Sequence, residues 1–144
     1  MRMSTKGRYA LRAIVEISLA EGEAVSVAQI AQTHDLSRGY LEQLIQKLRR
    51  AGLVQSIQGA RGGYILARRP EDISVADVLN AAGEPMDVVE CMGADWICPG
   101  ADTCRTKKAW QTINDGIRSI TQTITIASLL SDAPTGTEEA SKHG

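Results

Sequence analysis

The sequence predicts a mainly α-helical protein with one small β-hairpin and a long C-terminal helix. Apolar residues recur every three or four positions over most of the chain, and the period changes to two only around residues 53–67. The chain contains no Phe and only five Trp and Tyr residues, so its core must be built from Leu, Ile, Val and Ala. A length of 144 residues with 43% hydrophobic residues is typical of a single domain.

Capping residues mark the first three helices. The first should cover residues 5–20, with Ser4 or Thr5 as its cap. A second, short helix should follow Ser26, because Ser26-Val27-Ala28-Gln29 has the pattern of a capping box, and it should stop near residue 34. After a tight turn that buries Leu36, Ser37 should cap a third helix over residues 38–51, which Gly52 ends.

A hairpin and two further helices complete the chain. Strands are expected over residues 53–57 and 64–67, joined by a glycine-rich loop at 59–63. A short helix over 75–82 and a long helix over 103–130 flank an irregular stretch. The expected domain organisation is 1–83 for the helices and hairpin, 84–102 for a cysteine-bearing loop, 103–130 for the long helix, and 131–144 for a disordered polar tail.

The second and third helices with their short turn have the pattern of a helix-turn-helix, and the hairpin that follows is a wing. In such a motif the start of the second helix of the pair enters the major groove. The residues expected there are Ser37, Arg38, Gly39, Tyr40 and Glu42. Glu42 can accept a hydrogen bond from a cytosine amino group and repels phosphate, so it is a candidate for specificity.

Several cations complete the expected DNA contacts. Arg61, between glycines at the wing tip, can enter a narrow minor groove. Lys6 and Arg8 are candidate phosphate contacts. Lys47, Arg49 and Arg50 either contact phosphates or form the solvated face of their helix.

The two halves of the chain carry opposite charge. Residues 1–70 contain eleven Lys and Arg against five Asp and Glu, whereas residues 71–144 contain five against twelve. A basic N-terminal half in a chain of net charge −1 is consistent with a polyanionic partner for that half.

Three cysteines, Cys91, Cys98 and Cys104, are spaced C-x6-C-x5-C. An odd number cannot form a complete set of disulfides within one chain. Structural zinc prefers four ligands at short spacings, and the only histidines, His34 and His143, lie far away in the sequence. Iron–sulfur clusters tolerate wider spacings in loops. A cluster, zinc and unligated thiols all remain open from the residues alone.

The long helix carries an apolar seam at heptad spacing. Its members alternate at intervals of three and four residues: Trp110, Ile113, Ile117, Ile120, Ile124 and Ala127. Such a narrow seam predicts a homodimer, which also suits a helix-turn-helix that reads two half-sites of a palindromic duplex operator. The alternative is a helix packed against its own domain.

Three segments resemble the Rrf-type winged-helix transcriptional regulators, and specifically the IscR, NsrR and RirA group. They are residues 3–12 (MSTKGRYALR), 37–44 (SRGYLEQL) and 59–64 (GARGGY). The resemblance covers about residues 1–130. It implies a bacterial dimeric regulator with a crossing C-terminal helix, and the three-cysteine pattern implies an iron–sulfur cluster.

The chain departs from this group at the fourth cluster ligand. Lys107 stands where some members have a histidine, and Arg8 stands where others have an aspartate. Nearby carboxylates are Asp87, Glu90, Asp95 and Asp102, and a non-protein ligand is equally open. Three cysteines without the histidine favour a four-iron cluster over a two-iron cluster, with the fourth ligand unidentified.

The favoured function is therefore a DNA-binding regulator controlled by an iron–sulfur cluster that reports iron–sulfur status, nitric oxide or redox state. A metal-free thiol-sensing regulator of the same fold is the alternative. A redox enzyme is disfavoured because the chain lacks a nucleotide-binding glycine fingerprint and a Ser/His/Asp set. No apolar run reaches the ~20 residues of a membrane span, and residues 1–7 lack the apolar run of a signal peptide, so we expect a cytoplasmic protein.

Overall fold

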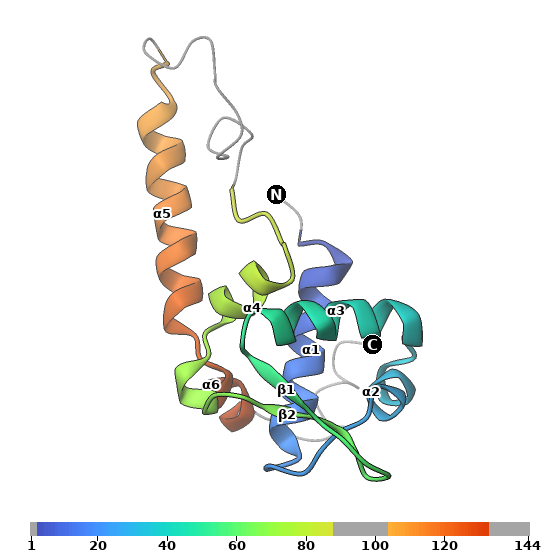
Figure 1. The fold of residues 1–144 in the computed structure, drawn as a ribbon. Helices are drawn as coiled ribbons and strands as arrows, with labels where there is room; N and C mark the ends of the chain where they lie inside the picture. Colours follow the sequence, from blue (N-terminus) through green and yellow to red (C-terminus); the bar gives the residue numbers. More distant parts are fainter. Residues whose placement is uncertain (1–2, 88–103, 133–144) are drawn as a thin grey trace, which may run out of the picture.

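The computed structural model describes residues 3–87 and 104–132 (Figure 1). Its elements follow in the order α1 (Thr5–Leu19), α2 (Val27–His34), α3 (Arg38–Arg50), β1 (Val54–Ile57), β2 (Gly63–Leu66), a 3-10 turn η1 (Pro70–Asp72), α4 (Val75–Ala81), α5 (Lys107–Thr123) and α6 (Ile126–Ser131). The predicted fold class, mainly helical with a winged helix-turn-helix, is confirmed.

Helix α1 lies at the centre of the core. It packs against α3, α4, α6 and β2, and its side chains Ala10, Ala13, Ile14 and Ile17 are buried. The face of α3 that meets it buries an aliphatic set at the predicted helical spacing: Leu41, Leu44, Ile45 and Leu48. Small side chains on α1 allow these helices to approach closely, so an aliphatic core forms without any Phe.

The predicted caps hold α2 and α3. Ser26 and Gln29 form the expected capping box, with the Ser26 amide donating to Gln29 Oε1 at 2.8 Å and the Gln29 amide donating to Ser26 Oγ at 3.1 Å. Ser37 caps α3 by accepting from the Tyr40 amide at 3.5 Å. Ser4 stands at the N-cap of α1, as expected, but the expected capping hydrogen bond is absent: its hydroxyl donates to Glu84 and accepts no amide of its own helix.

The predicted hairpin forms, with strands within one residue of the expected bounds, and it has a third partner that sequence patterning did not reveal. β1 and β2 are antiparallel, with Val54 opposite Leu66 and Ile57 opposite Gly63. The backbone of Val25, just before α2, pairs with Tyr64 through two hydrogen bonds of 3.0 and 2.8 Å. The wing is thereby fixed to the start of the helix-turn-helix.

The long C-terminal helix is shorter than the expected 103–130. It begins at Lys107 and ends at Thr123, and the chain continues in an extended conformation at Ile124. The Ile124 carbonyl accepts from the Val75 amide, and the Ile126 amide donates to the Ile73 carbonyl, each at 2.8 Å. The run Thr123-Ile124-Thr125-Ile126 is β-branched, which lowers helix propensity and suits this strand-like pairing.

Because α5 ends at Thr123, the two ends of the predicted seam lie in different elements. α6 packs against α1, and Ile126 is fully buried in the core. Ile124 and Ala127, which we expected to continue the seam, lie beyond the end of α5. Within α5 the apolar seam therefore consists of Trp110, Ile113, Ile117 and Ile120, and this name is kept for those four residues.

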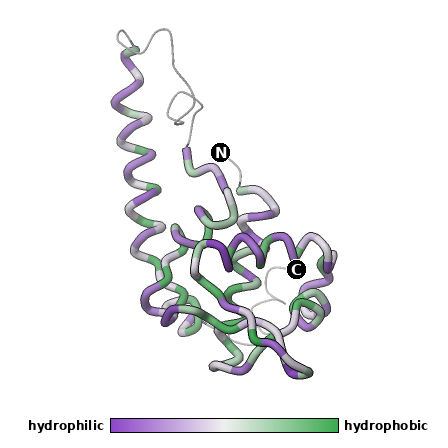
Figure 2. Tube along the Cα trace, viewed as in Figure 1, coloured by the Kyte–Doolittle hydropathy of each residue, from purple (hydrophilic) through white to green (hydrophobic). Residues whose placement is uncertain are grey.

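Helix α5 stands at the edge of the molecule and extends beyond the other described elements (Figure 1). It contacts α4, and Asn114 is its only residue that is buried. Apolar positions recur along its length in Figure 2. No helix among the described residues combines the length and the apolar character that crossing a bilayer requires.

The predicted cysteine-bearing loop lies largely outside the described residues, as do Cys91, Cys98 and most of the predicted tail. The domain boundaries at 83, 102 and 130 remain predictions.

Candidate DNA-binding face and cysteine site

The start of α3 is exposed and carries polar side chains. Its buried residues anchor one side of the helix, which leaves Ser37, Arg38, Gly39 and Glu42 exposed on the other. A Cβ atom added at Gly39 would meet nothing within 4 Å, so the fold itself does not require glycine there. A glycine at such an open position suits close approach of an external partner to the helix backbone.

Helix α3, the second helix of the helix-turn-helix and therefore the candidate recognition helix, also carries an ion pair. Arg38 Nε lies 3.4 Å from Glu42 Oε1, one turn later, and both side chains are more than half exposed. Such a surface pair contributes little to stability, because solvent screens it. Its main consequence is that the Glu42 carboxylate engages the Arg38 guanidinium, which could otherwise approach a phosphate.

Tyrosines brace α3 against its neighbours. Tyr40 on α3 meets Tyr9 on α1 edge-to-face, with ring centroids 6.1 Å apart. Tyr64 on β2 accepts a hydrogen bond at its hydroxyl from Gln46 Nε2 of α3, at 3.1 Å. All three tyrosines of the chain thus lie around the recognition helix, and two of them hold it from opposite neighbours.

The Tyr9 ring also lies beside two arginines that precede and follow it on α1. The guanidinium carbons of Arg8 and Arg12 lie 6.0 and 5.8 Å from the ring centroid, within the range of a cation–π contact. Sequence reasoning predicted Arg8 and Tyr40 but missed Tyr9 and Arg12. The confinement of all three tyrosines to the basic half of this aromatic-poor chain was the signal that could have found Tyr9.

Two glycines shape the wing that presents Arg61. A Cβ at Gly62 would lie 2.4 Å from the Ile57 carbonyl oxygen, and one at Gly63 would lie 2.5 Å from the Val25 backbone. Gly63 also has a φ of 156°. The tight turn and the close approach to Val25 therefore both require glycine. Arg61 is exposed and lines a hollow of about 540 Å³ between the wing tip and the start of α2.

The predicted phosphate contacts fall into two groups. Lys6 and Arg8 lie in the first turns of α1, and Arg8 is beside Tyr9, which contacts Tyr40 at the start of α3. On the last turns of α3, Lys47 Nζ donates to the Ala82 carbonyl at 3.5 Å and Arg49 donates to Gln46 at 3.3 Å. Both cations thus bond within the chain, and whether they contact phosphates or form a solvated face stays a prediction.

Cys104 is the one cysteine in the described part of the chain, and it is exposed. Its Sγ lies 3.3 Å from the Thr106 hydroxyl. Hydrogen bonds from the Thr106 hydroxyl and amide outweigh the effect of burial and, with the Lys107 amide and charge, lower the pKa of the Cys104 thiol. A lowered thiol pKa favours the thiolate, which is the form that binds metals.

The candidate fourth ligands are only partly described. Asp87 Oδ1 accepts from Asn114 Nδ2 at 3.1 Å and from Arg118 at 3.0 Å, so this carboxylate is already engaged by α5. Glu90, Asp95 and Asp102 lie outside the described residues. Over residues 3–87 and 104–132, no three His, Cys, Asp or Glu side chains gather as a metal site would need.

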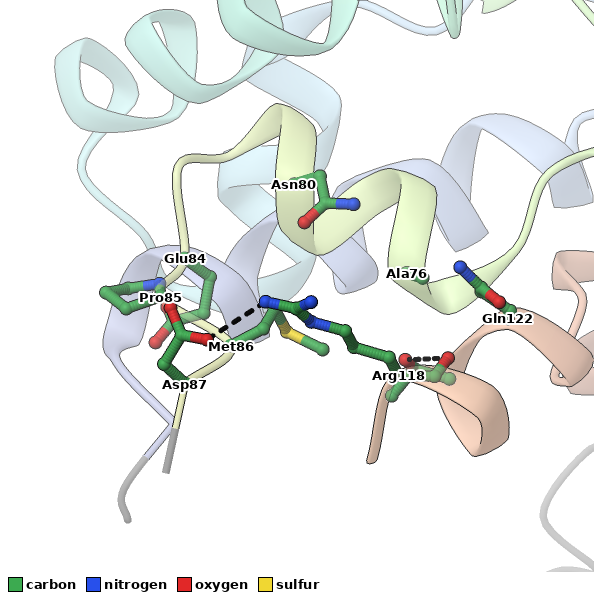
Figure 3. A pocket seen from close by; sticks show the side chains of 9 residues that line it. Ala76, Asn80, Glu84, Pro85, Met86, Asp87, Arg118 and Gln122 are labelled. Atoms are coloured by element: carbon green, nitrogen blue, oxygen red, sulfur yellow. Dashed lines mark hydrogen bonds and ion pairs between the residues drawn. The ribbon is translucent and has the colours of Figure 1, made fainter. Parts of the chain in front are cut away.

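The segment after α4 joins several elements, and sequence reasoning missed it. We call residues 82–87 the connector. Glu84 is 6% exposed and holds the start of α1 through Ser4, while Asp87 binds α5. A hollow of about 350 Å³ lies between the connector, α4 and α5, and Figure 3 shows Asp87 and Arg118 facing each other across it.

Comparisons with known proteins agree with this geometry. Residues 3–132 match the Rrf2 family model, described as an iron-dependent transcriptional regulator. The chain is 36% identical to the transcriptional regulator IscR of Escherichia coli O1:K1 over 133 residues, which is 92% of this chain and 82% of IscR.

Solved structures give the same answer. The structure of CymR, the global cysteine regulator of Bacillus subtilis, superposes with a TM-score of 0.76 at 36% identity, covering 93% of this chain and 99% of CymR. The structure of IscR from T. potens gives a TM-score of 0.75 at 35% identity, covering 96% of this chain and 93% of that one. The protein is therefore a transcriptional regulator and not an enzyme, and the chain belongs to the Rrf2 family.

Proposed function

We propose that the protein is a homodimeric, cytoplasmic regulator whose binding to a palindromic DNA operator is controlled by an iron–sulfur cluster on Cys91, Cys98 and Cys104. The observation that carries the DNA-binding part is the exposed start of α3, braced by Tyr9 and Tyr64 and flanked by the wing. Family membership supports the same activity.

On this proposal each exposed group has a role in DNA binding. Ser37, Arg38, Gly39, Tyr40 and Glu42 face the major groove, and Arg61 enters the minor groove. Lys6 and Arg8 contact the backbone beside α3, since they follow the N-terminus of a helix that packs against it. Glu42 serves discrimination because its negative charge disfavours every sequence that offers no donor.

The apolar seam of α5 supports the homodimer. Ile113 and Ile120 are 44% and 61% exposed in the single chain, and Trp110 and Ile117 are half-buried. Aliphatic side chains at heptad spacing lose this exposure when two copies of the helix pack together. A two-fold dimer would also present two recognition helices to two half-sites of a palindrome.

The chemistry of Cys104 supports the cluster. The thiol is exposed, and its lowered pKa favours the ligand form. A bound cluster would supply soft iron sites that tie thiolates together, and its gain or loss would change the constraints on the segment between the connector and α5. The four-iron form is favoured over the two-iron form, and its fourth ligand is unassigned because Lys107 and Arg8 occupy the positions of known ligands.

Anaerobic purification with an absorption spectrum and with iron, sulfide and zinc analysis tests the cluster. We expect a brown protein with one cluster per subunit, lost in each single Cys→Ser variant of Cys91, Cys98 and Cys104. Lys107→Ala should keep its iron. Protein without iron and sulfide after reconstitution, or with stoichiometric zinc, would overturn this part of the proposal.

A metal-free thiol-sensing regulator is the second candidate, favoured by the similarity to the cysteine regulator CymR and by the exposed, readily ionised Cys104. Colourless anaerobic protein whose DNA affinity changes with thiol oxidation would establish it.

Selection of bound sequences from genomic fragments at low salt tests DNA recognition itself, because phosphate contacts release counterions and are strongest there. Failure to enrich any sequence, in any metal or redox state, would contradict both candidates.

A further inference from the structure

Glu84 is a buried carboxylate placed against the first turn of α1. It is 6% exposed, although it follows a short helix at the surface. The Ser4 amide donates to Glu84 Oε1 at 3.1 Å, and the Ser4 hydroxyl donates to Oε2, across a separation of 80 residues. A Cβ atom at Gly7 would lie 2.8 Å from Glu84 Oε2, so a larger residue at this position would force the carboxylate to shift.

The Glu84 carboxylate replaces the side-chain cap that α1 lacks. The first amides of a helix lack partners within the helix, and its N-terminus attracts negative charge. Ser4 stands at the N-cap of α1, but its side chain accepts no hydrogen bond from the first turn. Glu84 supplies the negative charge in its place and holds the chain at Ser4. Burial raises the pKa of Glu84, but the Ser4 hydrogen bonds, the Lys6 charge and the Gly7 amide outweigh it, so the pKa lies below its ordinary value and the carboxylate is charged at neutral pH.

The turn that Glu84 holds carries two of the proposed phosphate contacts. Lys6 lies two residues after Ser4, and Arg8 follows on the same helix beside Tyr9, which packs on the recognition helix. The position of Ser4 therefore sets the path of the backbone that carries Lys6 and Arg8. The rest of the connector is also fixed, because the Ala82 carbonyl accepts from Lys47 of α3 and Asp87 pairs with Arg118 of α5.

We propose that Glu84 is a positioning residue for DNA binding, which holds the first turn of α1 so that Lys6 and Arg8 meet the DNA backbone. The inference rests on the proposed contacts of Lys6 and Arg8 with phosphate. Glu84 itself does not touch the nucleic acid.

The sign of the effect separates positioning from plain electrostatics. Glu84→Gln removes a negative charge close to Lys6, so a role limited to long-range charge predicts tighter binding to DNA. Positioning predicts weaker binding, because the amide can accept from only one of the two Ser4 donors and lacks the negative charge at the start of α1, which loosens the first turn. Glu71→Gln is the matched control, since it removes the same charge from an exposed side chain that pairs with Arg69.

The experiment uses the full-length cluster-free protein and a fluorescently labelled duplex of random sequence, since phosphate contacts do not depend on sequence. We expect Glu84→Gln to weaken binding about fivefold at low salt and to make the slope of log affinity against log salt shallower by about 1 to 2. Glu71→Gln should leave the affinity unchanged or slightly higher.

A double-mutant cycle gives a readout that a general loss of stability would not produce. Lys6→Gln should weaken binding in the wild-type background and have little effect in the Glu84→Gln background, because the misplaced cation contributes nothing there. Arg61→Gln on the wing should weaken binding by the same factor in both backgrounds. Circular dichroism and thermal melting should show both proteins folded at the assay temperature.

Two further variants address the same contact if Glu84→Gln does not fold. Ser4→Ala removes only the hydroxyl donor, and Gly7→Ala places a methyl group against the carboxylate. Alanine has a higher helix propensity than glycine, so weaker DNA binding by Gly7→Ala would point to the displaced contact. Both variants should abolish most of the Lys6 contribution.

Equal Lys6→Gln effects with and without Glu84, or tighter binding by Glu84→Gln, would overturn the inference and leave the proposed function intact. If Lys6→Gln and Arg8→Gln have no effect in the wild-type protein, the proposed α1 contacts are wrong and the inference falls with them.

Discussion

The Arg38 guanidinium and the Glu42 carboxylate pair at 3.4 Å on the exposed start of the recognition helix. The pair places a neutralised cation where a DNA-binding helix would otherwise present a free one. Its two side chains are 68% and 52% exposed, so fold stability gains little from it. On the proposed function, the carboxylate at this position serves DNA recognition and not folding.

Glu42→Ala should therefore broaden the set of bound sequences. Loss of the carboxylate frees Arg38 for phosphate or guanine and removes a repulsive charge, so affinity for random duplex should rise. Discrimination at the affected base pair should fall by about 1 to 3 kcal/mol. Sequence selection followed by fluorescence anisotropy checks both effects, with Glu71→Ala as the charge-matched control. Unchanged sequence preference would contradict the assignment.

Ile120→Glu should convert a dimer into a monomer. Ile120 is 61% exposed in the single chain, so the charge should cost the folded monomer little, but an unpaired carboxylate buried between two α5 helices is strongly unfavourable. Sedimentation velocity at micromolar concentration measures the change. Ser119→Glu adds the same charge on another face of α5 and should remain dimeric. An Ile120→Glu protein that sediments as the wild type does would argue against the seam.

Ile126→Ala should destabilise the protein by about 2 to 5 kcal/mol, because it removes a fully buried side chain and leaves a cavity. Denaturant unfolding measures the free energy of unfolding. Leu19→Ala, at a residue that is 56% exposed, should cost well under half as much. If the two variants cost the same, the packing of α6 in the core is wrong.

The Cys104 thiol should titrate below its ordinary value of 9.0, because the Thr106 hydroxyl and amide stabilise the thiolate. Alkylation rates of cluster-free Cys91→Ser/Cys98→Ser protein, measured against pH, report this pKa directly. Thr106→Val should move the midpoint of the rate profile upwards. A midpoint that does not respond to this substitution would show that the hydroxyl is not the cause.

Glu84 should make stability depend on acidity. Its folded pKa lies below the ordinary value of 4.5, so the unfolded chain binds the proton first as the pH falls. The contribution of Glu84 is thus complete above 4.5 and is lost as the pH falls through the lower folded pKa. Denaturant unfolding of wild type and Glu84→Gln between pH 7 and pH 3 should converge at the acidic end. Parallel curves would show that the carboxylate titrates normally.

Much of the helix-turn-helix could be predicted from local patterns. Ser26 with Gln29 and Ser37 with Tyr40 are contacts three residues apart, so their spacing along the chain already implies their geometry. The wing followed from the change of period and from glycines that the turn requires. Apolar spacing on α3 identified the face that Leu41 and Leu48 bury.

The seam shows where a local pattern misled. Ile124 and Ala127 continue the three-four spacing of α5, but the chain leaves the helix at Ile124 to pair with residues 73–75. Those hydrogen bonds join residues about fifty positions apart. A prediction from local sequence cannot compare their energy with that of a continued helix. The burial of Ile126 against α1 further stabilises the non-helical path of the chain at Ile124.

Local chemistry therefore determined the helices of the helix-turn-helix, the caps of α2 and α3 and the polar face of α3, because each depends on neighbours within one or two turns. Tertiary structure decided the partners of Tyr9, Asp87 and Glu84, whose contacts cross from one element to another. Glu84 is the clearest case, because its neighbours in the sequence predict only an exposed carboxylate after a short helix. It becomes the cap of α1 only when the packing of α4 on α1 brings it to Ser4, 80 residues away.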